Sequence, residues 1–195
     1  MASSNTRDRI LDAANKLFYR EGIRGVSVDA VAASAGVTKK TLYYHFKSKD
    51  DLVAGYLESR DQPNLKLFAQ WYDAAEGSPA DKTAAIFQRL AKNARHPKWR
   101  GCGFLRTAAE LANLPGHPAV VIGAAHKKKF EAWLAACYGD AGIKGAEKLA
   151  RSIALLMEGA FSAMLMHRDA SYAEAAGETA LTLVKQAAKG AKNKR

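Results

Sequence analysis

The chain has 195 residues, of which 48% are hydrophobic, and it contains only 5 prolines and 15 glycines. This composition is typical of a helix-forming globular protein and excludes a disordered chain. The formal net charge of +11 suggests an anionic partner, but residues 1–60 hold 10 Lys or Arg against 7 Asp or Glu, so most of the excess lies elsewhere. Net charge alone therefore does not locate a binding face.

Several function classes lack their usual signals. No apolar run approaches the roughly 20 uncharged residues of a membrane-spanning helix, and the N-terminus lacks a signal-peptide core, so we expect a cytoplasmic protein without a membrane segment. Cys102 and Cys137 are expected to be free thiols. The five histidines show no metal-ligand spacing, and no triad context or phosphate-binding glycine loop is present. We expect no metal, no cofactor and no enzymatic activity.

The first expected helix runs from Thr6 to about Arg20. Steps of three and four residues lead from Ile10 through Ala13 or Ala14 to Leu17 and Phe18, which places these residues on one helical face. The Thr6 hydroxyl is the predicted N-cap, and Gly22 is the residue at which the helix is expected to stop.

Two short helices follow. Ser27 is the predicted N-cap of a helix that Gly36 ends, and Thr38 is the predicted N-cap of the next. Leu42 and Phe46, four residues apart, would face inward. A helix-turn-helix of this size can place its second helix in the major groove of DNA. The opposite face of that helix carries Lys39, Lys40, Thr41, Tyr43, Tyr44 and His45.

The stretch RDRILDAANKLFYREGIRGVSVDAVAASAGVTKKTLYYHFKSKDDL, Arg7 to Leu52, resembles the TetR-type (tetracycline-repressor-like) transcriptional regulators. The resemblance implies an all-α fold with a helix-turn-helix DNA-binding domain, residues 1–50, and a larger helical domain, residues 51–195, for ligand binding and dimerisation. It also implies a homodimer on double-stranded operator DNA. The implied DNA-binding residues are Ser27, Lys39, Lys40, Thr41, Tyr43, Tyr44, His45 and Lys49. For Tyr43 and Tyr44, packing against neighbouring helices remains an alternative.

A fourth helix should begin after Ser48, and Pro63 should break or kink it where the small domain hands over to the large one. Further helices are expected at about 65–75, 79–95, 103–114, 119–138, 145–167 and 171–189. The last two form an expected antiparallel pair. This pair either completes a dimer interface, which the resemblance favours, or only closes its own lobe.

An effector pocket follows from the resemblance, and its predicted residues are Trp71, Phe87, Phe104, Arg106, Glu110, Met157 and Phe161. Arg106 and Glu110 would be its polar anchors. Each of the seven also fits a core position, and an Arg or Lys partner is the alternative for Glu110.

The leading hypothesis is a ligand-responsive repressor that binds a palindromic operator as a homodimer and is released by an unknown small-molecule effector. The alternative is a non-specific or architectural nucleic-acid-binding protein that uses the basic tail beyond Lys185. A third and weaker hypothesis is an enzyme that keeps a vestigial helix-turn-helix.

Overall fold

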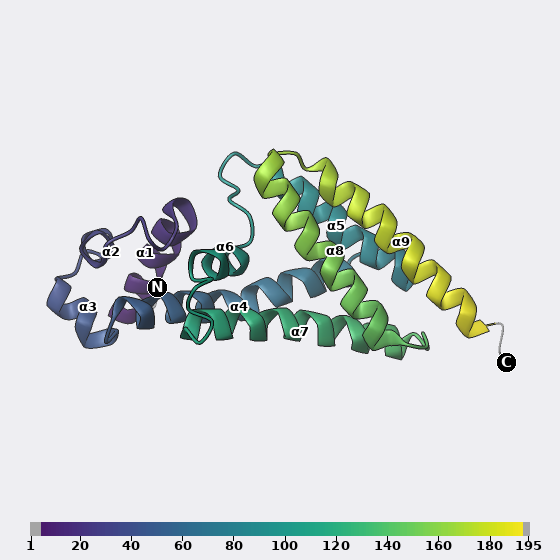
Figure 1. Ribbon diagram of the computed structural model, residues 1–195, viewed down its shortest axis with the longest axis horizontal. Coiled ribbons are helices and arrows are strands. Elements are labelled where there is room, and N and C mark those ends of the chain that lie inside the picture. The colour runs from purple at the N-terminus through teal and green to yellow at the C-terminus, as the bar shows by residue number, and fades with distance from the viewer. Residues whose placement is uncertain (1–4, 193–195) are drawn as a thin grey trace. The chain divides into compact units, whose positions relative to one another are not determined.

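The computed structural model describes residues 5–192, apart from the side chains of residues 191 and 192, so the end of the basic tail at 193–195 lies outside the described residues. Within 5–192 the chain forms nine α-helices and no strand, which confirms the predicted all-α fold (Figure 1). The helices are α1 Thr6–Glu21, α2 Val28–Ala35, α3 Lys39–His45, α4 Lys49–Asp73, α5 Pro79–Ala94, α6 Gly103–Glu110, α7 Pro118–Asp140, α8 Ala146–His167 and α9 Ser171–Lys192.

The chain divides into two compact units. The first comprises Met1–Pro63 and Cys102–Ala125, and the second comprises Asn64–Gly101 and His126–Arg195. Helices α4 and α7 contribute residues to both. The first unit therefore contains α6 as well as the helix-turn-helix, whereas the functional boundary expected at residue 50 remains a prediction.

Helix α1 begins one residue earlier than its predicted cap implies. The Asn5 side chain accepts a hydrogen bond from the Arg7 amide at 3.3 Å, and Thr6 is already helical. Thr6 as N-cap is therefore wrong, because the Asn5 side-chain oxygen reaches the N–H two residues ahead. Gly22, at φ 84°, ends the helix as predicted.

The caps predicted for α2 and α3 are confirmed. The Ser27 hydroxyl accepts from the Ala30 amide at 3.1 Å, and the Thr38 hydroxyl accepts from the Thr41 amide at 3.1 Å. Gly36 ends α2 at φ 64°, a left-handed conformation that glycine adopts without a Cβ penalty. These three residues fix where the two helices begin and where the first one stops.

Helix α4 is continuous through Pro63, so of the break or kink predicted there the break is wrong. The helix starts as expected, since the Ser48 hydroxyl accepts from the Asp51 amide at 3.0 Å. Proline in a helix interior costs about 3 kcal/mol. Packing on both sides offsets this cost, because Tyr56 and Leu57 are buried before Pro63 and Tyr72 is buried after it.

In the second unit, α5 packs against α9, and α9 also packs against α8. Ser78 and Asp81 cap α5 reciprocally, and Phe87 and Leu90 of α5 are buried. Aromatic rings of α4 and α7 meet in the same unit, with the Phe68 and Phe130 ring centroids 5.1 Å apart.

Two further observations qualify the sequence-based expectations. Helix α6 ends at Glu110 and not near residue 114, because Leu111 leaves helical geometry at φ −111°, ψ 20°. Among the described helices, α8 alone is long and apolar enough to meet the length and composition test for a membrane span. Core helices of soluble proteins pass the same test, and α8 buries Ile153 and Met157 within its unit.

Candidate nucleic-acid interface

Helix α3 has one face in the core and one face exposed. Leu42 is fully buried and Phe46 is 1% exposed, which confirms both as inward positions. On the other face Tyr44 is 86% exposed and Tyr43 is 43% exposed. Packing against neighbouring helices is therefore ruled out for Tyr44, and its ring is available to a partner.

Two arginines of α1 contact the helix-turn-helix segment, one at the end of α3 and one at the end of α2. The Arg7 guanidinium lies 5.0 Å from the centroid of the Phe46 ring, which is a cation–π contact. The Arg9 guanidinium donates to the Ala35 carbonyl at the end of α2. Sequence reasoning placed neither arginine at the site, because neither contact has a local sequence signal.

The first lysine of α3 is already paired. Lys39 Nζ donates to Asp29 Oδ2 at 3.0 Å, and both side chains are more than half exposed. The hydrogen bond that Lys39 donates to the Asp29 carboxylate raises the pKa of Lys39. An ion pair this exposed contributes little to stability, so Lys39 can leave Asp29 for another anionic partner at small cost.

The other predicted DNA-binding residues all belong to the first unit. Lys40 is exposed and Lys49 is half-buried at the start of α4, and neither has a hydrogen-bond or ion-pair partner within residues 5–190. The Thr41 hydroxyl lies 2.8 Å from the Thr38 hydroxyl. His45 is half-buried and packs edge-on to Tyr44, with ring centroids 5.2 Å apart. Ser27 is exposed and serves as the cap of α2.

The structure divides the seven predicted effector residues between the two units. Phe104, Arg106 and Glu110 belong to the first unit, and Trp71, Phe87, Met157 and Phe161 belong to the second. Phe87, Met157 and Phe161 are buried, whereas Trp71 is half-buried. Arg106 and Glu110 bond to the backbone of the helix-turn-helix segment, a role that their sequence positions did not indicate.

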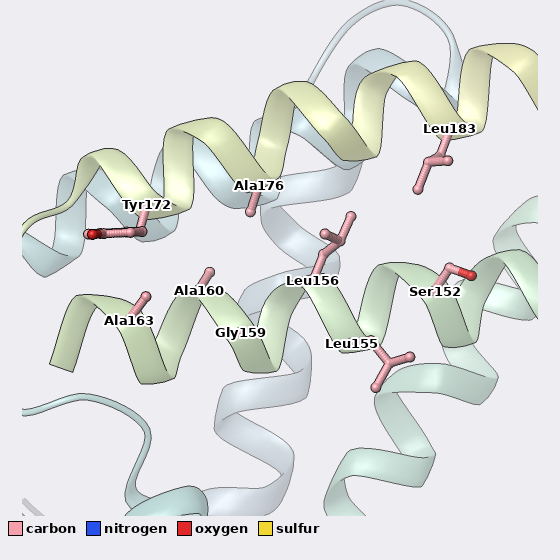
Figure 2. Close-up of a pocket in the computed structure, with 9 residues that line it drawn as sticks. All are labelled: Ser152, Leu155, Leu156, Gly159, Ala160, Ala163, Tyr172, Ala176 and Leu183. Atoms are coloured by element: carbon pink, nitrogen blue, oxygen red, sulfur yellow. The ribbon is translucent and has the colours of Figure 1, made fainter. Parts of the chain in front are cut away.

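The second unit carries an apolar hollow of about 460 Å³ between α8 and α9. In Figure 2, Leu156 of α8 and Ala176 and Leu183 of α9 point into the space between the two helices. Leu155 and Tyr172 also line it and are 68% and 41% exposed. Large apolar side chains gathered at an exposed surface are typical of an interaction site.

Comparison with known proteins relates this helix-turn-helix architecture to one family. Residues 10–56 match the sequence profile described as "Bacterial regulatory proteins, tetR family". The chain has a TetR-family DNA-binding domain. The profile spans most of α1, all of α2 and α3, and the first part of α4, so the TetR-family resemblance of the sequence is confirmed.

Curated relatives match this chain over part of its length. The regulator SrpR of Pseudomonas putida is 38% identical over 61 residues, which are 31% of this chain and 29% of SrpR. The repressor KstR2 of Mycolicibacterium smegmatis is 29% identical over 112 residues, which are 57% of this chain and 54% of KstR2. The matches thus span well under two thirds of either relative. Both are named as regulators, in agreement with the prediction that the chain is not an enzyme.

Solved TetR-family structures match over nearly the whole chain. SCO4454 of Streptomyces coelicolor has a TM-score of 0.76 at 29% identity, covering 95% of each chain. A TetR-type regulator from Streptomyces avermitilis has a TM-score of 0.79 at 29% identity, covering 94% of this chain and 98% of that one. The TetR-family fold therefore extends beyond the DNA-binding domain.

Proposed function

We propose that the protein is a cytoplasmic, ligand-responsive transcriptional repressor that binds a palindromic operator as a homodimer and is released by a small-molecule effector. The observation that carries this proposal is the exposed polar face of α3. Helix α3 is capped by Thr38, and Leu42 and Phe46 are buried on the side opposite this face. Repression is supported by KstR2, which is named as a repressor.

In the proposed complex, α3 enters the major groove. Lys39 and Lys40 bond to base edges or phosphates, and Thr41, Tyr43 and Tyr44 supply hydroxyls and rings that can meet thymine methyl groups. Contacts to the flanking phosphates come from Ser27, His45 and Lys49. Phosphate contacts give most of the affinity, and base contacts give sequence choice.

The proposed homodimer forms through α8 and α9. Their apolar surface, on which Leu155 is exposed and Leu156 and Leu183 are half-buried, is the type of surface that a second copy covers in a four-helix interface. A two-fold dimer requires an operator with two-fold symmetry. Its half-sites should lie about 34 Å apart, one turn of DNA, or a multiple of that distance.

The proposed effector binds outside the DNA reader, which is the pair of helices α2 and α3. It can release DNA only by binding one arrangement of the protein more tightly than the other. Trp71, Phe87, Met157 and Phe161 are our candidate contacts in the second unit, and they favour an apolar or aromatic compound. Phe104, Arg106 and Glu110 of the first unit are also predicted effector contacts.

A gel-shift titration with the DNA that flanks the protein's own gene tests the proposal. We expect a shift that an excess of random-sequence DNA does not abolish and that Tyr44→Ala weakens. Equal affinity for all sequences, with loss of binding on truncation after Lys185, would favour the non-specific alternative. Mass spectrometry of small molecules that co-purify with the protein would identify an effector.

A further inference from the structure

The carboxylate of Glu110, the last residue of α6, is bonded to the loop between α1 and α2. Glu110 Oε1 accepts from the Ile23 amide at 3.2 Å, and Oε2 accepts from the Arg24 amide at 2.9 Å. Both oxygens are therefore used, and both donors are backbone groups of the α1–α2 loop. Hydrogen bonds donated to an ionised acceptor are about twice as strong as those between neutral groups.

Gly22 makes this approach possible. It has φ 84°, where L-residues are strained, and a Cβ at this position would lie 2.8 Å from Glu110 Oε1. Any side chain at position 22 would therefore displace the carboxylate as well as strain the backbone. Gly22 thus serves the contact with Glu110 in addition to ending α1.

A second bond joins the same two segments. Arg106, one turn before Glu110 on α6, donates to the Tyr19 carbonyl at 2.6 Å. Tyr19 is in the last turn of α1, where backbone carbonyls lack partners within the helix. Helix α6 thus holds the end of α1 through a cation and the following loop through an anion.

The loop that Glu110 holds leads directly into the DNA reader. Ile23 and Val26 are 5% and 2% exposed, and Ser27, the cap of α2, comes next. Helix α2 is in turn bonded at its far end to Arg9 and is joined to α3 by a short turn. A displacement of the loop should therefore also displace α2 and, through the short turn, α3.

We propose that Glu110 is a positioning residue for DNA reading: its carboxylate fixes the α1–α2 loop, and thereby α2 and α3, in the arrangement that binds the operator. This inference rests on the proposed function. Glu110 itself contacts no DNA, so its removal should reduce operator recognition without removing a phosphate contact. It also gives Glu110 a role other than effector binding.

The test compares E110A and E110Q with wild type in the full-length chain, using operator DNA and random DNA at several salt concentrations. For E110A we expect an operator affinity lower by about tenfold, a random-DNA affinity changed by less than about twofold and an unchanged salt slope. E110Q should be intermediate, because an amide keeps one acceptor oxygen. E21Q, which removes the same charge at exposed Glu21, is the matched control and should bind as wild type.

Amide hydrogen exchange reports on the contact without DNA. E110A should accelerate exchange at Ile23 and Arg24 while the core amides of α1 keep their protection. G22A should reproduce the E110A effect, and the double variant should be no worse than G22A, because both changes remove the same contact. This keeps the inference testable if one variant folds poorly.

The outcomes separate the two proposals. Operator binding by wild type together with unchanged operator affinity in folded E110A would overturn the positioning role and leave the proposed function intact. Failure of wild type to prefer operator over random DNA would overturn the proposed function. A loss of thermal stability in E110A with unchanged affinity per folded molecule would show a structural role only.

Discussion

The Arg9 guanidinium lies 2.7 Å from the carbonyl oxygen of Ala35, the last residue of α2, and its Nη2 also reaches the Gly36 carbonyl at 3.1 Å. Carbonyls at a helix C-terminus lack intrahelical donors, and a cation there is favoured by the helix dipole. Helix α1 thereby holds the turn that separates the two helices of the DNA reader.

Arg9→Met should loosen this turn while keeping much of the side-chain volume. We expect a loss of about 1–2 kcal/mol in the free energy of unfolding, because two carbonyls lose a charged donor, together with weaker operator binding. Urea denaturation and a gel-shift titration measure the two effects. Arg20→Met is the control: Arg20 is also on α1 but pairs only with exposed Glu21, so a comparable loss there would refute the bracing role of Arg9.

Lys40→Ala should reduce the salt dependence of DNA binding. If the free ammonium of Lys40 contacts one phosphate, the slope of log K against log salt should become shallower by about 0.9. Fluorescence anisotropy at several salt concentrations measures this slope. Lys92→Ala, at an exposed position of α5, should leave the slope unchanged. Equal slopes for Lys40→Ala and wild type would show that Lys40 makes no phosphate contact.

Tyr44→Ala should separate DNA binding from stability. Because Tyr44 is 86% exposed, we expect the free energy of unfolding to change by less than about 0.5 kcal/mol. Operator affinity should fall by about 1–3 kcal/mol if the tyrosine reads a base. Leu42→Ala is the opposite case, with an expected loss of about 2–5 kcal/mol in stability, since Leu42 is fully buried. A Tyr44→Ala variant with wild-type operator affinity would remove this residue from the site.

Leu155→Asp should convert the proposed homodimer to a monomer. Leu155 is 68% exposed on the apolar surface of α8 and α9, and burying an unpaired carboxylate in an interface is costly. Sedimentation equilibrium reads the result directly. Leu114→Asp, at a position that is 48% exposed in the first unit, should leave the dimer intact. A dimeric Leu155→Asp variant would place the interface elsewhere.

The protein should lose stability as the pH rises from about 10 to about 12. Burial raises the pKa of Tyr56 to about 12, so the unfolded chain loses its proton first, near pH 10. Between the two values the folded state binds more protons, and the free energy of unfolding falls with pH. Tyr56→Phe should reduce that fall by about 2–3 kcal/mol in urea midpoints taken across this range. A pH profile identical to wild type would show that Tyr56 titrates normally when folded.

The sequence by itself determined the local features of the DNA reader. Caps at Ser27 and Thr38, the stop at Gly36 and the inward spacing of Leu42 and Phe46 are set by bonds and periodicity within a few residues. Such features can be predicted from the sequence because the residues involved are neighbours in the chain. The family match over residues 10–56 rests on the same segment.

Only the tertiary structure decided what depends on distant residues. Helix α4 continues through Pro63 because burial of Tyr56 and Tyr72 outweighs the local cost of proline, which a local rule cannot weigh. Glu110 meets amides 86 and 87 residues away, and no spacing pattern encodes that pairing. Local sequence features therefore show where the DNA reader lies, whereas packing between distant segments determines which residues hold it in place.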